Sequence, residues 1–360
     1  MAMRSRWLLL LLLSGCSADP QQQIYGDYRH RLLSLLKVAA APLATPTLAK
    51  PQPQPVPPAL TISLPQAWHY RHCGLLAAVG ERNSGLGKVM VLSQRAAYEQ
   101  RLLTTLNQCR NLYPPSTSEY QQLTEWYQHK QQSWPQLLVA VATDSDMRRL
   151  WHDDGRPRHG DSEALALLQV LAQLQKTTAA DSEALLQALE QQLAANRSNR
   201  YLGQLWRDAN LALSAISDLN QQLGPAMSQV VCVGGRPSAH ARQLRQFLDH
   251  YFGGQVQPQL NLLLAELERS EQALAAAAIS PVLEQPQPSR QLRSALQAHV
   301  QLWQQLLRRC QLSPSHLPQR DPQAALSPPQ AALTDTSAAA TRGICSSRNP
   351  AMLIRPPGTT

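Results

Sequence analysis

Long apolar runs, aromatic side chains and strand-like patterns are all scarce in this sequence of 360 residues. The apolar run at residues 7–13 is far shorter than the roughly 20 residues that a membrane-spanning helix needs. Aromatic residues make up 5% of the chain, and no group of basic residues is interleaved with them as a base-stacking surface requires. Strand-like stretches are limited to residues 60–64 and 230–233. We therefore expect a helical protein that has no nucleic-acid partner.

The beginning of the chain has the pattern of an exported lipoprotein. Arg4 and Arg6 precede the apolar run, and the tetrapeptide LSGC then ends at Cys16. This tetrapeptide resembles the lipobox, in which small residues precede the cysteine that receives acyl chains. We expect a signal peptide at residues 1–15 and attachment to the membrane through lipid on Cys16. Ser17 follows, where lipoproteins kept in the inner membrane usually have Asp. This favours a periplasm-facing outer-membrane lipoprotein, with the inner membrane as the alternative.

The chain is basic, and an odd number of cysteines follows Cys16. The formal net charge is +9, and it becomes +7 after the signal peptide is removed, with 31 Lys and Arg against 24 Asp and Glu. In the cell envelope this balance favours a protein or an anionic polymer as the partner. The five other cysteines cannot all pair within one chain, and Cys345 is our candidate for the unpaired one.

A helical hairpin between Cys73 and Cys109 has the most regular pattern. Its second arm carries an apolar stripe at spacings of 4, 4, 3 and 4, formed by Tyr98, Leu102, Leu106, Cys109 and Tyr113. Its first arm, about residues 65–81, is expected to bury Trp68, Leu75, Leu76 and Val79. Turn residues lie between the arms, and Ser93 is expected to cap the second one. Cys73 then faces Cys109, and export supplies oxidising conditions for a disulfide between them.

Helical periodicity continues through most of the remaining chain. Residues 202–223 keep a 3,4 apolar spacing until Gly224 and Pro225, which are expected to end that helix. Two DSEAL phrases, at residues 161–165 and 181–185, predict another helical hairpin. Further helices are expected at residues 238–252, 258–275 and 289–312. Cys232 and Cys310 lie in apolar surroundings, and a disulfide between them is one of the pairings that four cysteines allow.

The predicted fold is all-α, a multi-helix bundle of about eight to ten helices at residues 60–312. Residues 16–59 combine the lipidated N-terminus, one amphipathic helix and a proline-rich tether. Residues 313–360 are rich in Pro, Ala and Ser and have no apolar periodicity, so we expect a disordered tail.

The turn of the hairpin holds the residues most able to carry chemistry. These candidates are Glu81, Arg82, Asn83, Ser84, Lys88, Arg95 and Glu99. A phosphate-binding loop is excluded because Val89 stands where Ser or Thr would hold magnesium. Glu81 and Glu99 would suit a pair of hydrolytic carboxylates. The alternative is that they form ion pairs with the nearby arginines and fix the end of the hairpin.

Residues 69–73 contain the one spacing that suits a metal. His69, His72 and Cys73 would place two zinc ligands on one helix face. A closed site needs a third and a fourth ligand, none is near in the sequence, and the expected disulfide uses Cys73. We therefore expect no metal and no other cofactor, and we assign no catalytic residue.

Several short sequences resemble one protein family. The phrases CGL at residues 73–75, GERNSGLGKVM at 80–90, SQR at 93–95 and FLDHYFGG at 247–254 carry the likeness. They resemble the uncharacterised gammaproteobacterial lipoproteins of domain-of-unknown-function family 3080, over about residues 20–312. This chain departs from the family in having Leu92, where the family often has proline. The resemblance implies a lipoprotein and adds no catalytic residues.

Two functions remain open at this point. The first is a non-enzymatic, lipid-anchored helical protein that binds a partner or forms a scaffold in the cell envelope. The alternative is a hydrolase or transferase of envelope polymers that uses the turn of Glu81, Arg82 and Asn83. The two differ in whether Glu81 and Asn83 line an open cleft or are satisfied by other side chains.

Replacing Cys16 by Ala tests the lipid anchor. The variant should remain uncleaved or become soluble, because the acyl chains that hold it to the membrane need the cysteine sulfur. Fractionation of cells, with the mass of the protein measured in each fraction, checks this. Mature, membrane-bound Cys16→Ala protein would contradict the lipoprotein assignment.

Overall fold

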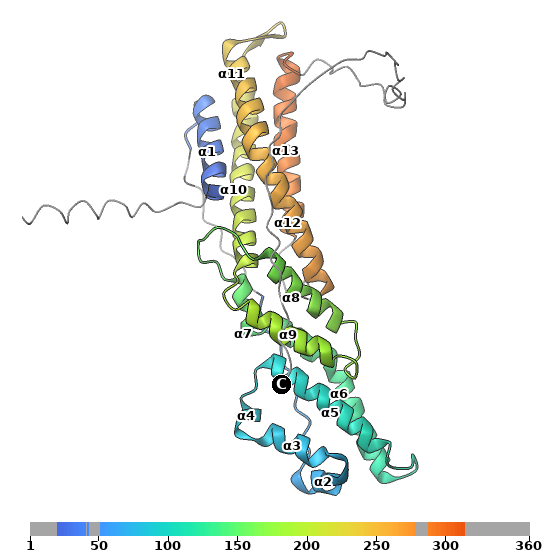
Figure 1. Cartoon of the computed structure of the whole chain (residues 1–360). Coiled ribbons are helices and arrows are strands. Elements are labelled where there is room, and N and C mark those ends of the chain that lie inside the picture. The colour runs from blue at the N-terminus through green and yellow to red at the C-terminus, as the bar shows by residue number, and fades with distance from the viewer. Residues whose placement is uncertain (1–19, 41, 43–50, 278, 280–286, 314–360) are drawn as a thin grey trace, which may run out of the picture. The chain divides into compact units, whose positions relative to one another are not determined.

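The computed structural model describes residues 20–40, 42, 51–277, 279 and 287–313, and nearly all of its regular structure is helical (Figure 1). The longer helices are α1 (Pro20–Leu35), α3 (Leu75–Asn83), α5 (Leu92–Arg110), α6 (Ser118–Ala142), α8 (Asp161–Leu174), α9 (Glu183–Ala195), α10 (Tyr201–Ser228), α11 (Ala239–Phe247), α12 (Gln257–Ala276) and α13 (Pro288–Arg309). The shorter elements are α2 (Leu64–His69), η1 (Arg71–Cys73), α4 (Gly85–Lys88), α7 (Ser145–Arg148), η2 (Arg149–Trp151), the π-helical η3 (Leu248–Val256) and a hairpin of β1 (Cys232–Val233) with β2 (Arg236–Pro237). The all-α prediction is confirmed. The expected signal peptide, Cys16, Cys345 and residues 314–360 of the expected tail lie outside the described residues.

Helix α10 is the centre of the larger core and packs against α13, α1 and α12. Its 3,4 apolar spacing produces a stripe that is buried along its whole length, from Leu202 to Leu223. Gly203 allows the chain to approach closely, since a Cβ there would lie 2.6 Å from the carbonyl oxygen of His152. The expectation that Gly224 and Pro225 end this helix is wrong. The helix continues to Ser228 with Pro225 inside it.

A smaller core lies between α2, α3, α5 and α6, and the disulfide of Cys73 with Cys109 belongs to it. The Cα atoms of the two cysteines are 5.2 Å apart, which confirms the predicted hairpin pairing. The stripe on α5 is buried as predicted, from Tyr98 through Leu106 to Cys109. This disulfide closes the arms of the hairpin opposite its turn.

Two details of the hairpin differ from the prediction. The first arm is broken at Tyr70 into α2 and η1, and again at Gly74, whose left-handed backbone with φ of 88° separates η1 from α3. Trp68 therefore lies before both breaks and is 59% exposed, although burial was expected. Ser93 does not cap α5, since Val91 holds that position and Ser93 is buried within the first turn.

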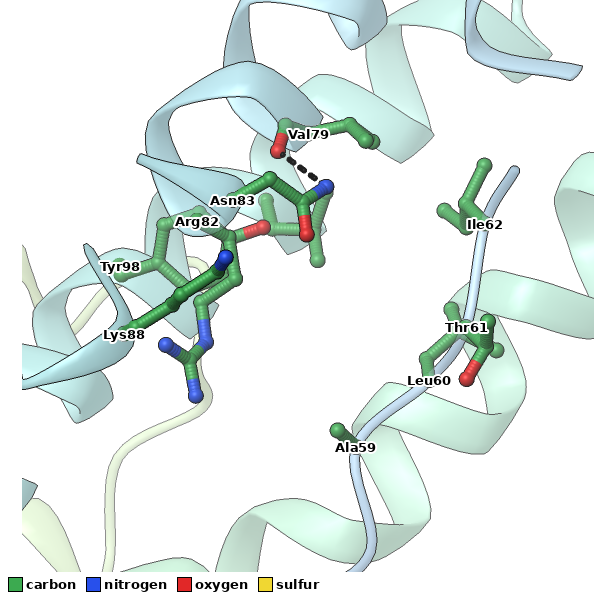
Figure 2. A pocket seen from close by; sticks show the side chains of 10 residues that line it. Ala59, Leu60, Thr61, Ile62, Val79, Arg82, Asn83, Lys88 and Tyr98 are labelled. Carbon is green, nitrogen blue, oxygen red and sulfur yellow. Dashed lines mark hydrogen bonds between the residues drawn. The ribbon is translucent and has the colours of Figure 1, made fainter. Parts of the chain in front are cut away.

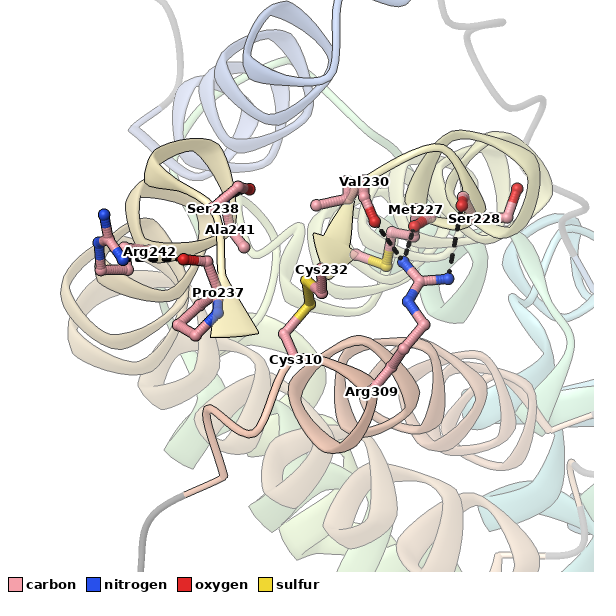
Figure 3. The surroundings of a disulfide bond; sticks show 10 residues. All are labelled: Met227, Ser228, Val230, Cys232, Pro237, Ser238, Ala241, Arg242, Arg309 and Cys310. Carbon is pink, nitrogen blue, oxygen red and sulfur yellow. Dashed lines mark hydrogen bonds between the residues drawn. A yellow bond between two sulfur atoms is a disulfide. The ribbon is translucent and has the colours of Figure 1, made fainter. Parts of the chain in front are cut away.

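The second disulfide joins Cys232 to Cys310 and ties β1 to the end of α13 (Figure 3). Beside it, the guanidinium of Arg309 donates hydrogen bonds to the carbonyl oxygens of Met227, Ser228 and Val230. These carbonyls lie at and just beyond the end of α10, where the backbone C=O groups lack the full set of intrahelical partners. The cation and the disulfide together fix the last turns of α10 and α13 to each other.

Helix α1 forms part of the larger core, although its sequence placed it in the segment before the domain. The phenol of Tyr28 is fully buried and lies 2.6 Å from Nε2 of His299. Asn220 determines which ring nitrogen of His299 carries the proton. The Nδ2 of Asn220 donates to the carbonyl of Ala295, so the Oδ1 of Asn220 is left as an acceptor. Nδ1 of His299 therefore carries the proton and donates to this Oδ1 at 2.9 Å. Nε2 then accepts a hydrogen bond from Nε1 of Trp303 at 3.1 Å. The buried imidazole is therefore neutral.

His299 predicts how stability depends on pH. Burial lowers the pKa of His299 from 6.5 to about 4. Below pH 6.5 the unfolded chain takes up a proton that the folded chain does not. Stability is therefore fully present above pH 6.5 and is lost as the pH falls towards 4. Between pH 7 and pH 5 the loss should be about 2 kcal/mol.

Chemical denaturation of the unmodified chain and of His299→Gln, at pH 7 and at pH 5, isolates this contribution. Gln does not titrate, so the unmodified chain should lose about 2 kcal/mol more than the variant between the two pH values. An equal loss in both proteins would show that His299 titrates normally.

Candidate functional site

The turn of the hairpin is built from the end of α3 and the short helix α4. Ser84 ends α3, and its Oγ accepts a hydrogen bond from the backbone N–H of Gly87 at 3.0 Å. A Cβ at Gly87 would overlap the carbonyl oxygen of Glu81 and lie 2.7 Å from that of Arg82, so only glycine fits there. Arg82 closes the turn by donating from Nη1 to the carbonyl of Gly87. The phrase ERNSGLGK is thus a tightly folded unit.

A cavity of about 270 Å³ lies between this turn and the extended chain at residues 59–62 (Figure 2). We call it the hairpin groove. It is lined by Ala59, Leu60, Thr61, Ile62, Val79, Arg82, Asn83, Lys88, Tyr98 and Leu102. The polar side chains of Arg82, Asn83 and Lys88 lie on the helical side of the groove, opposite residues 59–62. The sequence did not predict that residues 59–62 face the turn.

The groove contains two cations and no carboxylate. Among the described residues, the guanidinium of Arg82 is bonded only to a backbone carbonyl, and the side chain of Lys88 has neither a hydrogen bond nor an ion pair. Tyr98 is 4% exposed at the base of the groove, and burial raises the pKa of its phenol. The groove therefore offers an anion two positive charges beside a neutral phenol.

The two candidate carboxylates are held elsewhere and by different partners. Glu81 pairs with Arg101 at 2.6 Å on the exposed side of the hairpin. Glu99 is 5% exposed and pairs with Lys130 at 2.7 Å, and Arg95 lies 3.6 Å from the same carboxylate. Ion pairs of these glutamates with nearby arginines were the alternative expected from the sequence; Arg95 forms one, whereas Arg82 is bonded only to a backbone carbonyl. The sequence did not predict Lys130 or Arg101.

The buried ion cluster of Glu99, Lys130 and Arg95 holds three segments together. Burial lowers the pKa of Lys130, while the Glu99 carboxylate opposes that shift. Arg95 also donates from Nη2 to the carbonyl of Pro57 at 3.1 Å. The cluster thus joins α5 to α6 and fixes the extended chain that leads into the groove. These residues position the site and do not line it.

A second charged cluster was missed by the sequence analysis. Arg207 binds Asp153 at 2.9 Å and Asp208 at 2.9 Å, and Arg158 binds Asp208 and Glu266. Together they fix the loop at residues 152–160 to α10 and α12. The mixture of acidic and basic residues in HDDGRPRHG, at residues 152–160, could have indicated this cluster from the sequence. Each charge faces an opposite one, so the cluster stabilises the loop.

The residues considered for zinc have other partners. Nε2 of His72 lies 3.2 Å from the hydroxyl of Tyr113, His69 lies 3.6 Å from Glu119, and Cys73 is in a disulfide. In the part of the chain that the structure describes, no three His, Cys, Asp or Glu side chains come together as a metal site would require.

None of the described helices combines the length and apolarity of a membrane span.

Replacing Glu99 by Gln tests the buried ion cluster. The variant should lose about 3 to 5 kcal/mol of unfolding free energy, because Lys130 would stay buried without its carboxylate. Glu81→Gln is the matched control: it breaks an ion pair on the surface and should change stability little. Urea denaturation of both variants measures the difference. Equal stabilities would contradict the role given to Glu99.

Comparison with known proteins identifies the family. A family model described as protein of unknown function (DUF3080) matches residues 25–314. No curated protein and no solved structure matches the chain. The matched region runs from α1 to the end of α13 and includes both disulfides and the hairpin groove. Because the match covers well over half of the sequence, the chain belongs to the DUF3080 family.

Proposed function

We propose that this protein is a lipid-anchored, periplasm-facing protein without enzymatic activity that binds a partner in the cell envelope through the hairpin groove. The observation that carries the proposal is the presence of Arg82 and Lys88 in the groove without a carboxylate to neutralise them. Cations that lack a counter-ion in a concave site attract an anionic ligand. This matches the anionic character of envelope polymers and of acidic protein segments.

The arrangement of carboxylates supports binding over hydrolysis. A glycosidase or a related hydrolase needs an acid and a base, or a nucleophile, that face the same substrate. Glu81 is held by Arg101 and does not line the groove, and Glu99 is buried against Lys130. Asn83 lines the groove, but neither Glu81 nor Glu99 does. Among the described residues, this turn therefore presents no pair of carboxylates to the groove, which favours binding over hydrolysis there.

The start of α1 is compatible with a close membrane anchor. Helix α1 begins at Pro20, four residues after Cys16. A chain of that length spans at most about 14 Å. If Cys16 carries lipid, the folded protein is therefore held near the surface of the bilayer, with the outer membrane as the proposed location.

Photocrosslinking in intact cells tests this function. A photoreactive amino acid at Leu86, which is 83% exposed beside Lys88, should form an adduct with an envelope component. The same probe at Leu262, which is 58% exposed on α12, is the control. Adding Lys88→Glu to the Leu86 probe should remove the adduct, because it reverses one of the two charges. Identical adducts from the probes at Leu86 and Leu262 would contradict the proposal. An adduct at Leu86 that Lys88→Glu does not change would contradict it as well.

A further inference from the structure

We propose that the hairpin groove binds an extended peptide segment with carboxylate groups, which pairs with the backbone of residues 59–62. This inference rests on the proposed binding function and names the class of its ligand. Three properties of the groove carry it: an extended segment with unpaired backbone groups, two cations without counter-ions, and an amide oxygen on the side opposite that segment.

Residues 59–62 form an extended segment that belongs to no helix or sheet (Figure 2). Leu60 and Ile62 are directed towards the smaller core, whereas Ala59 and Thr61 are exposed, which is the alternation of a strand with one buried face. Among the described residues, none of the backbone N–H and C=O groups at positions 59–62 makes a hydrogen bond. An unpaired strand edge is a template for adding a second strand.

The segment is held in place at both ends. Before it, the backbone N–H of Gln54 donates to Oγ1 of Thr143 at 3.1 Å, and Pro57 is bonded to Arg95. After it, Ser63 forms a capping box with Gln66 and starts α2. A segment already fixed in an extended conformation loses little conformational entropy when a ligand pairs with it.

The opposite side of the groove fits a peptide better than it fits phosphate. Asn83 donates from Nδ2 to the carbonyl of Val79 at 3.0 Å, which leaves its Oδ1 as an acceptor (Figure 2). Arg82 and Lys88 are donors. A peptide with acidic side chains offers N–H groups to the acceptor and carboxylates to the cations, whereas a fully ionised phosphate offers acceptors alone.

The size of the groove fits a short segment. Its volume of about 270 Å³ lies just below the roughly 300 to 1,000 Å³ of typical ligand pockets. Leu86 and Val89 lie on the same turn and are 83% and 74% exposed, but they do not line the groove.

The test uses the full chain and an eight-residue peptide of alternating Thr and Glu, with the same peptide carrying Gln in place of Glu. Binding is measured by fluorescence anisotropy, and backbone pairing by hydrogen exchange with mass spectrometry. The acidic peptide should bind about tenfold more tightly than the Gln peptide, as expected for a charge-assisted hydrogen bond. It should also slow amide exchange at residues 59–62.

Lys88→Glu should weaken binding of the acidic peptide about tenfold. Lys176→Glu, the same charge change on an exposed lysine elsewhere, should leave the binding unchanged. Equal affinity for both peptides, or binding that leaves exchange at residues 59–62 unchanged, would overturn the proposal. Competition by inorganic phosphate without protection of residues 59–62 would overturn it in favour of a simple anion site. If peptide binding fails but the Leu86 crosslink persists, the proposed function stands without this ligand.

Discussion

The burial of Glu99 is the constraint on which the groove depends. A carboxylate that is 5% exposed has to be neutralised, and Lys130 and Arg95 do this from α6 and from α5 itself. Glu81 is neutralised separately by Arg101. The carboxylates of the hairpin are therefore used outside the groove, and Arg82 and Lys88 keep their charge available to a ligand.

The two disulfides stabilise the two cores in which these contacts form. Cys73 and Cys109 close a sequence separation of 36 residues in the smaller core, and Cys232 and Cys310 close 78 residues at the edge of the larger one. In the chain-entropy treatment each is worth about 4 kcal/mol. The disulfide of Cys73 with Cys109 also keeps the end of the hairpin opposite its turn closed.

Hydrophobic periodicity in the sequence predicted features that depend on a single helix. It did not predict contacts between segments that are far apart in the sequence. The stripe from Tyr98 to Cys109 was sufficient to predict the buried face of α5, because that face follows from a 3.6-residue repeat, and the hairpin register then brought Cys73 opposite Cys109. The break at Gly74 depends on a left-handed backbone that the sequence pattern did not reveal. Lys130 is 31 residues from Glu99, and the extended segment at residues 59–62 reaches the turn only through tertiary packing.

Double-mutant cycles on Lys88 test the central claim most directly, namely that this cation is free of the hairpin carboxylates. Unfolding free energies would be measured for the single and double substitutions of Lys88 with Glu81 and of Lys88 with Glu99, and Lys130 with Glu99 would serve as the reference pair. The account predicts additivity within about 0.5 kcal/mol for both Lys88 cycles and a coupling of about 1 to 3 kcal/mol for the reference pair. A coupling of Lys88 to either glutamate as large as that of the reference pair would contradict it.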